Sequence, residues 1–216
     1  MNHRSQMFSK CLVISALTLG SQIFNWQVPA NNAALAKCQT AQSADIGAEK
    51  PKVTDETIDG KPYCVSRLIV KARPDRVWQV LTDYRHAINV FPLLKKCEVT
   101  QDHGATKIVR HEIAPSGIPD TYEYLLEIRE TAPKLVEWHR LSGDFKNVDG
   151  FWKLEPVNVG AYTQVTYASH VTGGFFEPQI LIRRQSHIDM PGTILALKKR
   201  SESAVQIASV GDSRAN

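Results

Sequence analysis

The sequence predicts an α+β domain in which one strand, two short helices, six further strands and a long C-terminal helix follow one another. A run rich in β-branched residues, Cys64 to Ala72, gives way abruptly to a helix that Pro74 starts, since proline is tolerated in a first turn. Short segments of alternating apolar and polar residues follow, separated by turn-forming residues, as in an antiparallel sheet. A helical pattern returns from Phe175 onward, so the domain ends in a helix.

Residues 1–36 have the organisation of a secretory signal peptide. A weakly positive start precedes the apolar run Cys11 to Phe24, and the A-x-A cleavage signal Ala34-Leu35-Ala36 follows it. Because the run is shorter than the roughly 20 residues of a membrane span, we expect cleavage after Ala36 and export to the periplasm, a comparable lumen or the medium. An uncleaved membrane anchor is the alternative.

The charge balance of the mature chain gives no case for a nucleic-acid partner. Loss of Arg4 and Lys10 with the signal peptide lowers the basic residues from 26 to 24 against 22 acidic ones, so the net charge falls from +4 to +2. A nearly neutral chain lacks the basic surface that a phosphate backbone requires.

Three cysteines, Cys38, Cys64 and Cys97, remain in the mature chain. Because an exported protein meets an oxidising compartment, one bridge and one free thiol form the first interpretation. In the second, Cys64 and Cys97 are small buried apolar side chains on strands. Three cysteines are too few for a disulfide scaffold in either case.

The mature chain is expected to hold one folded domain over residues 61–203. Residues 37–60 are rich in Ala, Gln, Asp, Glu and Lys and poor in large apolar side chains, so they predict a flexible leader. Residues 204–216 predict a disordered tail. No internal repeat or second domain boundary lies between them.

Two short helices are expected after the first strand. The helix that Pro74 starts has an acidic residue, Asp75, in its first turn, where it complements the helix dipole, and an apolar face within residues 77–81. Tyr84 to Asn89 predicts the second helix, which Phe91-Pro92 ends.

The C-terminal helix is expected in two stretches, Pro178 to Ile188 and Gly192 to Arg200. Pro191 lies between them and should kink the helix or begin a new first turn. Ile188 belongs to the face that we expect to turn toward the sheet.

Alternation assigns the inner faces of the later strands. In Tyr122 to Glu130 the apolar side chains alternate with Glu123, Glu127 and Arg129, which must face solvent. Because a hairpin fixes which residues share a face, the partner strands place their large apolar residues on the same side, with Tyr167 among them. The expected pairs are Leu126 with Trp138, Ile128 with Val136, Tyr124 with Arg140, Leu154 with Thr163 and Trp152 with Val165.

The first hairpin decides whether charged residues point inward. A tight turn at Asp102-His103-Gly104-Ala105 with a two-residue loop places Cys97 opposite Arg110. Arg110 and Glu112 then share the inner face. A slip of one residue would reverse this assignment.

Three motifs carry a resemblance to a known superfamily. They are Val77-Trp78-x-x-Leu81 in the first helix, and Gly150-x-Trp152-x-Leu154-x-Pro156 with Thr163-x-Val165-x-Tyr167 in the last hairpin. Over residues 61–203 the chain resembles the START-like, helix-grip (SRPBCC) superfamily and within it the polyketide cyclase/dehydrase and coenzyme Q-binding branch. The resemblance implies a curved antiparallel sheet of about seven strands, wrapped around the long C-terminal helix, with an apolar cavity inside.

The implied cavity gives the inward side chains a role. The aromatic residues are expected to line it and bind a hydrophobic small molecule, although they would equally fill a core. An unpaired buried arginine is costly, so Arg110 either pairs with Glu112 or contacts a ligand oxygen. Ser116 to Pro119 is expected at the rim of the cavity. The expected ligand-binding residues are Tyr122, Tyr124, Trp138, Trp152, Tyr167, Arg110, Glu112, Arg140 and Ile188.

The sequence lacks the signatures of several catalytic chemistries. No two histidines have the H-x-x-x-H spacing of a metal site, and neither the G-x-S-x-G nucleophile elbow nor a phosphate loop is present. We therefore expect no metal or cofactor and assign no catalytic residue.

Three functional hypotheses remain. The first is an exported, non-enzymatic carrier for a quinone, isoprenoid, pigment or lipid, with transient membrane contact. The sequence does not define its oligomeric state. The second is a cyclase/dehydrase-type enzyme in which Arg110, Glu112 and Tyr124 are the acid/base candidates. The third is a protein-interaction module whose interior is filled.

Overall fold

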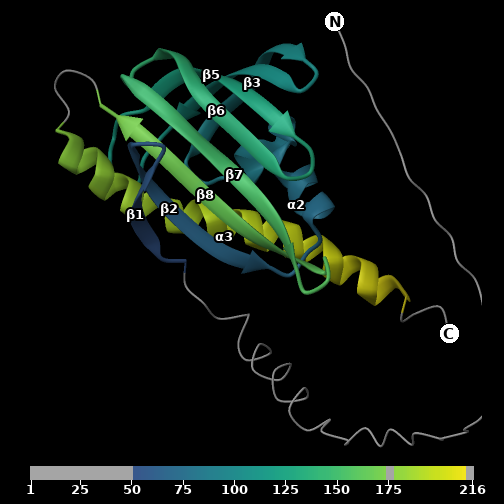
Figure 1. The fold of residues 1–216 in the computed structure, drawn as a ribbon. Helices are drawn as coiled ribbons and strands as arrows, with labels where there is room; N and C mark the ends of the chain where they lie inside the picture. Colours follow the sequence, from purple (N-terminus) through teal and green to yellow (C-terminus); the bar gives the residue numbers. More distant parts are fainter. Residues whose placement is uncertain (1–50, 174–177, 213–216) are drawn as a thin grey trace, which may run out of the picture. The chain divides into compact units, whose positions relative to one another are not determined.

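The computed structural model describes residues 51–173 and 178–212. The expected signal peptide, residues 1–36, and the leader as far as residue 50 lie outside the described residues, as do residues 213–216 of the expected tail. Figure 1 shows the described part as an antiparallel sheet with one long helix packed along it.

The sheet has eight antiparallel strands in the order β1-β2-β8-β7-β6-β5-β4-β3. The last strand of the chain therefore pairs with β2, and from β8 back to β3 the order follows successive hairpins. The strands are β1 (Val53–Ile58), β2 (Lys61–Val70), β3 (Leu94–His103), β4 (Thr106–Ile113), β5 (Tyr122–Thr131), β6 (Leu135–Gly143), β7 (Asn147–Val157) and β8 (Tyr162–Thr172).

The two short helices lie between β2 and β3, where the sequence placed them. The helix α2 (Pro74–Leu81) has proline in its first turn and Asp75 beside it, and it buries Val77, Val80 and Leu81. A short 3₁₀ helix, η1 (Tyr84–Asn89), follows within the predicted bounds. This helix leads directly into Phe91 and the start of β3, so it covers one end of the sheet.

The long helix α3 (Gln179–Asp212) continues past Pro191, so the two predicted stretches form one helix and Pro191 does not begin a new one. Proline removes one backbone donor and crowds the preceding turn, which costs a few kcal/mol. The burial of Met190, Ile194 and Leu197 on either side of this turn offsets that cost. The helix packs against β1, β2, β8 and α2 (Figure 1).

The end of α3 also corrects the expected tail. The helix continues to Asp212, so residues 204–212 are helical and not disordered. Among the described residues, no helix combines the length and the hydropathy that a membrane span requires.

The expected flexible leader is wrong for β1, which adds an eighth strand at the edge of the sheet. Val53 to Ile58 pair with Ser66 to Lys61 of β2, although only two of these six residues are large and apolar. An edge strand of this kind is held by backbone hydrogen bonds and by its charged side chains. The carboxylate oxygens of Glu56 accept two hydrogen bonds from Arg67, at 2.6 and 2.8 Å.

The registers of the two later hairpins differ from the prediction by two residues. Ile128 lies opposite Trp138, and Trp152 lies opposite Tyr167. Because side chains alternate with a period of two, this shift keeps the large apolar residues on their predicted face, while an irregularity between Leu125 and Leu126 places Tyr124 opposite Gly143 and not Arg140. The inner aromatic face of β5 to β8 is therefore as predicted, although the individual partners are not.

The first hairpin differs by one position, and this reverses a face. Cys97 pairs with His111 and not with Arg110, because the loop consists of Gly104 and Ala105 and a bulge interrupts β3 between Val99 and Gln101. The inner face of β4 accordingly carries His111, while Arg110 and Glu112 turn to the other side. The prediction that these two charged residues point inward is wrong.

Candidate functional site

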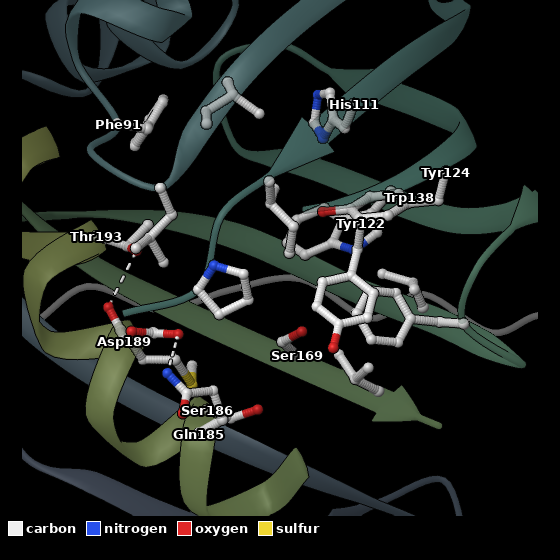
Figure 2. A pocket seen from close by; sticks show the side chains of 18 of the residues that line it. Phe91, His111, Tyr122, Tyr124, Trp138, Ser169, Gln185, Ser186, Asp189 and Thr193 are labelled. Atoms are coloured by element: carbon white, nitrogen blue, oxygen red, sulfur yellow. Dashed lines mark hydrogen bonds between the residues drawn. The ribbon is translucent and has the colours of Figure 1, made fainter. Parts of the chain in front are cut away.

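A cavity of about 770 Å³ lies between the inner face of the sheet, the segment after η1, and α3. Figure 2 shows Tyr122, Tyr124 and Trp138 of the sheet on one side of it, and Gln185 and Asp189 of α3 on the other. The interior is thus hollow, contrary to the alternative in which the aromatic residues fill a core. All five aromatic residues expected from the sequence line the cavity: Tyr122, Tyr124, Trp138, Trp152 and Tyr167.

Stacked rings build the wall of the cavity. The rings of Trp152 and Tyr167 lie opposite each other on β7 and β8, with centroids 4.0 Å apart and planes 10° from parallel. Tyr122 stacks on Phe145 with centroids 4.9 Å apart. Stacks of this kind favour one arrangement of large apolar side chains, so they help to define the shape of the wall. That these residues bind a ligand stays a prediction.

The three charged residues expected in the site do not line the cavity. Arg110 donates to the Glu123 carboxylate at 3.2 Å on the outer face, where both side chains are about half exposed. Glu112 shares this face. Arg140 donates to the backbone carbonyl of Gly143 at 2.8 Å. Its guanidinium also donates to the Lys146 carbonyl at 3.4 Å, so it stabilises the turn at the end of β6 and lies outside the cavity lining.

Ile188 lies at the mouth of the cavity rather than within it. Its side chain belongs to the lining but is 54% exposed on α3. Within the described part of the chain, the basic Arg184 and the acidic Asp189 of the same helix are the side chains of full charge that line the cavity. The imidazole of His111 is the other basic group in this lining. The fully charged side chains that line the cavity therefore lie on its α3 side.

The predicted rim loop is held against α3 by hydrogen bonds. Asp189 accepts a hydrogen bond from the backbone N–H of Ser116 at 3.3 Å. Gln185 donates to the Ser116 carbonyl at 2.9 Å and to the other Asp189 oxygen at 2.8 Å. Pro115 and Ile118, on either side, line the cavity, so the position of this loop sets the width of the mouth.

Sequence reasoning missed a polar group at the end of the cavity away from α3. Cys97, His111 and Tyr124 occupy adjacent positions across β3, β4 and β5, and all three line the cavity. Nε2 of His111 lies 3.5 Å from Sγ of Cys97, and the imidazole meets the Tyr124 ring edge-on at 5.8 Å. Only a correct register for the first hairpin would have found His111.

Burial keeps this polar group uncharged. Desolvation lowers the pKa of His111 to about 4 and raises the pKa of Cys97 to about 11. It also raises the pKa of Tyr124, and it raises the pKa of Tyr167 to about 12. A neutral imidazole, a thiol and two phenols therefore face the cavity at neutral pH.

The depressed pKa of His111 predicts an acid-sensitive fold. The unfolded chain binds a proton near pH 6.5 and the folded chain only near pH 4, so stability is complete above pH 6.5 and is lost as the pH falls toward 4. We expect His111 to account for about 2 kcal/mol of lost stability at pH 5. Urea unfolding of the protein and of His111→Phe at pH 7.5 and 5 would check this. An equal loss in the variant would contradict it.

Cys64 and Cys97 do not form a disulfide with each other; Cys64 is buried and Cys97 half-buried on their strands, in keeping with the second interpretation, while Cys38 lies outside the described residues. Cys64 lies with Asp55 and His187 in a group whose ligand atoms are within 4.8 Å of one another. Arg183 forms an ion pair with the same Asp55 carboxylate and lowers its pKa by hydrogen bonding. Because a guanidinium already neutralises this carboxylate, the group is an ion-pair cluster joining β1 to α3.

The fold and the cavity together define a helix-grip protein, an antiparallel sheet packed with a long helix around an apolar pocket. A profile of the family described as polyketide cyclase/dehydrase and lipid transport matches residues 64–202. The chain belongs to this family, within the START-like superfamily. A search of curated proteins found no match.

Solved structures with the same fold come from several bacteria. A STAR-related lipid transfer protein from Xanthomonas axonopodis aligns with a TM-score of 0.60 and 19% identity, over 72% of this chain and 96% of the other. The Zhui aromatase/cyclase from a Streptomyces species has a TM-score of 0.60 and 14% identity, with 66% and 94% covered. A protein from Thermus thermophilus has a TM-score of 0.60 and 18% identity, with 66% and 99% covered. At these identities the likeness establishes the fold.

Proposed function

We propose that this protein is an exported carrier that holds a hydrophobic small molecule, such as a quinone, isoprenoid, pigment or lipid, in its cavity. The observation that carries the proposal is a cavity of about 770 Å³ walled by aromatic and aliphatic side chains. A ligand that buries about 300 Å² of apolar surface there gains roughly 7 kcal/mol before the costs of association. The lipid transfer and cyclase proteins that share the fold support binding of this class of molecule.

The position of the charged residues favours a carrier over an enzyme. Arg110 and Glu112, two of the three acid/base candidates, lie outside the cavity. Tyr124 remains, but burial raises its pKa and so holds the phenol proton, while the low pKa of His111 makes its imidazole a weak base. The hollow interior likewise disfavours an interaction module with a filled core.

The first test is the identity of the natural ligand. The protein purified from its native compartment would be extracted with organic solvent and the extract analysed by mass spectrometry. A stoichiometric apolar compound is the expected result. An empty extract, together with failure of an apolar dye to enter, would overturn the carrier proposal.

Filling the cavity should abolish binding. We expect Ile113→Trp combined with Ser169→Trp, both at lining positions, to weaken binding of an apolar dye at least tenfold, because the added indole rings occupy the space of the ligand. Fluorescence titration measures the affinity, and circular dichroism confirms that the variant folds. Leu141→Trp, at a 44% exposed position outside the lining, is the matched control and should bind normally. Unchanged binding by the folded double variant would contradict the proposal.

Export and membrane contact are further parts of the proposal. Cleavage after Ala36 predicts a mature protein that begins at Lys37, which N-terminal sequencing of the natural protein would establish. Exposed aliphatic side chains of α3, Ile180, Leu181 and Ile188, support transient contact of the cavity mouth with a membrane. Flotation with lipid vesicles should detect this contact, and Ile188→Lys should weaken it.

A further inference from the structure

The group formed by Cys97, His111 and Tyr124 has hydrogen-bonding capacity that the protein does not use. Apart from the contact of His111 Nε2 with the thiol at 3.5 Å, the imidazole and the Tyr124 hydroxyl make no side-chain hydrogen bond to another described residue. Both side chains line the cavity. Because both side chains are reached from the cavity, their hydrogen-bond partner is whatever occupies it, either water or a polar atom of a ligand.

The thiol determines which imidazole nitrogen carries the proton. A neutral imidazole has one donor and one acceptor nitrogen, whereas a protonated thiol is a weak donor and its sulfur a weaker acceptor. We assign S–H of Cys97 as the donor to Nε2 of His111, which leaves the imidazole proton on Nδ1. Nδ1–H and the O–H of Tyr124 are then two donors without an acceptor.

The surroundings of these donors exclude a charged acceptor. The fully charged side chains that line the cavity, Arg184 and Asp189, both belong to α3. Figure 2 shows Asp189 on the opposite side of the pocket from His111 and Tyr124. The nearest walls are rings and aliphatic side chains, among them Phe145 at 5.8 Å from the Tyr124 ring. A carboxylate or phosphate placed here would lose its hydration without gaining a cation.

We propose that this end of the cavity recognises an uncharged carbonyl oxygen, as in a ketone, ester or quinone, which accepts hydrogen bonds from His111 and Tyr124. The inference rests on the proposed function and narrows the ligand to apolar molecules whose buried end carries a neutral acceptor. Fatty acids and lipid phosphates would bind only with their charged group at the α3 mouth, where Arg184 lies.

Three probes that share a naphthalene ring with a seven-carbon chain test this inference. They are the hydrocarbon heptylnaphthalene, the ketone heptanoylnaphthalene and the carboxylate anion of heptylnaphthoic acid. Each is titrated against the purified protein in competition with the dye aminoanthracene. The ketone should bind roughly threefold to tenfold more tightly than the hydrocarbon, the increment of one or two buried hydrogen bonds. The naphthoate should bind more weakly than the ketone by at least a similar factor.

Three variants test whether the ketone preference comes from His111 and Tyr124. Tyr124→Phe and His111→Phe should each reduce the ketone preference, measured as the ratio of ketone to hydrocarbon affinity within the same variant, while His111→Gln, which keeps an N–H donor, should retain part of it. If His111→Phe does not fold, the near-isosteric Tyr124→Phe decides. Equal affinity for ketone and hydrocarbon, or tighter binding of the naphthoate, would overturn the inference while hydrocarbon binding still supports the carrier. Failure of all three probes would overturn both.

Discussion

Gly150→Ala is expected to destabilise the protein by at least about 3 kcal/mol, the upper range for overpacking a core. Gly150 lies in β7 opposite Trp138 of β6 and beside Ser169 of β8. A Cβ atom at this position would overlap the Trp138 indole and lie 2.5 Å from the carbonyl oxygen of Ala168. The carbonyl belongs to a paired strand and cannot turn aside, so either the strands separate or Trp138 leaves the cavity wall.

Gly192→Ala provides the matched control, with an effect of opposite sign. Gly192 is an exposed residue inside α3, and a Cβ there would meet nothing within 4 Å. We expect this substitution to stabilise the protein by about 0.5–1 kcal/mol, because alanine loses less backbone entropy in a helix. Urea unfolding of both variants measures the two values. A cost below about 1 kcal/mol for Gly150→Ala would contradict the close approach of Trp138.

Trp152→Ala should be the other severe substitution, with a loss of about 3–5 kcal/mol. Trp152 is only 8% exposed, stacks on Tyr167 at 4.0 Å and lies 6.3 Å from the ring of Phe91. Its removal deletes a large buried surface and leaves a space that is continuous with the cavity, so the surroundings have little means of closing it. The same variant should change which ligands fit, because the wall on β7 recedes.

Trp152→Phe separates the stack from the size of the side chain. A phenyl ring retains the contact with Tyr167 and should recover more than half of the lost stability, as measured by chemical unfolding. Trp78→Ala is a second control, since Trp78 packs against the core from α2 without lining the cavity. If Trp152→Ala and Trp78→Ala cost the same, the stacked wall would have no special part in stability.

His111 could not be predicted as a cavity residue from the sequence. The alternation within each strand from β5 to β8 is a local signal, so a shift of two residues in register left Ile128, Trp138 and Trp152 on the predicted face. In β3 the bulge after Val99 inserts a single residue, and nothing in the local pattern marks it. This change of register by one residue places His111 in the cavity, where Arg110 was expected.

The tertiary structure explains why the G-x-W-x-L-x-P motif begins with a glycine, Gly150. The sequence contains the G-x-W-x-L-x-P pattern, and the pattern supported the family resemblance. The reason for the glycine is the indole of Trp138, which comes from the neighbouring strand and occupies the space of a side chain. A contact between strands cannot be read from either strand alone.

The sequence by itself determined the order of the elements, the two short helices, the inner aromatic face and the superfamily, because these depend on local periodicity and on short motifs. The tertiary structure decided three things that depend on contacts distant in sequence. The strand β1 forms by backbone pairing with β2, and α3 passes Pro191 because its buried face holds it on the sheet. The polar end of the cavity is a histidine because a bulge set the register of β4, and strand faces follow register rather than composition.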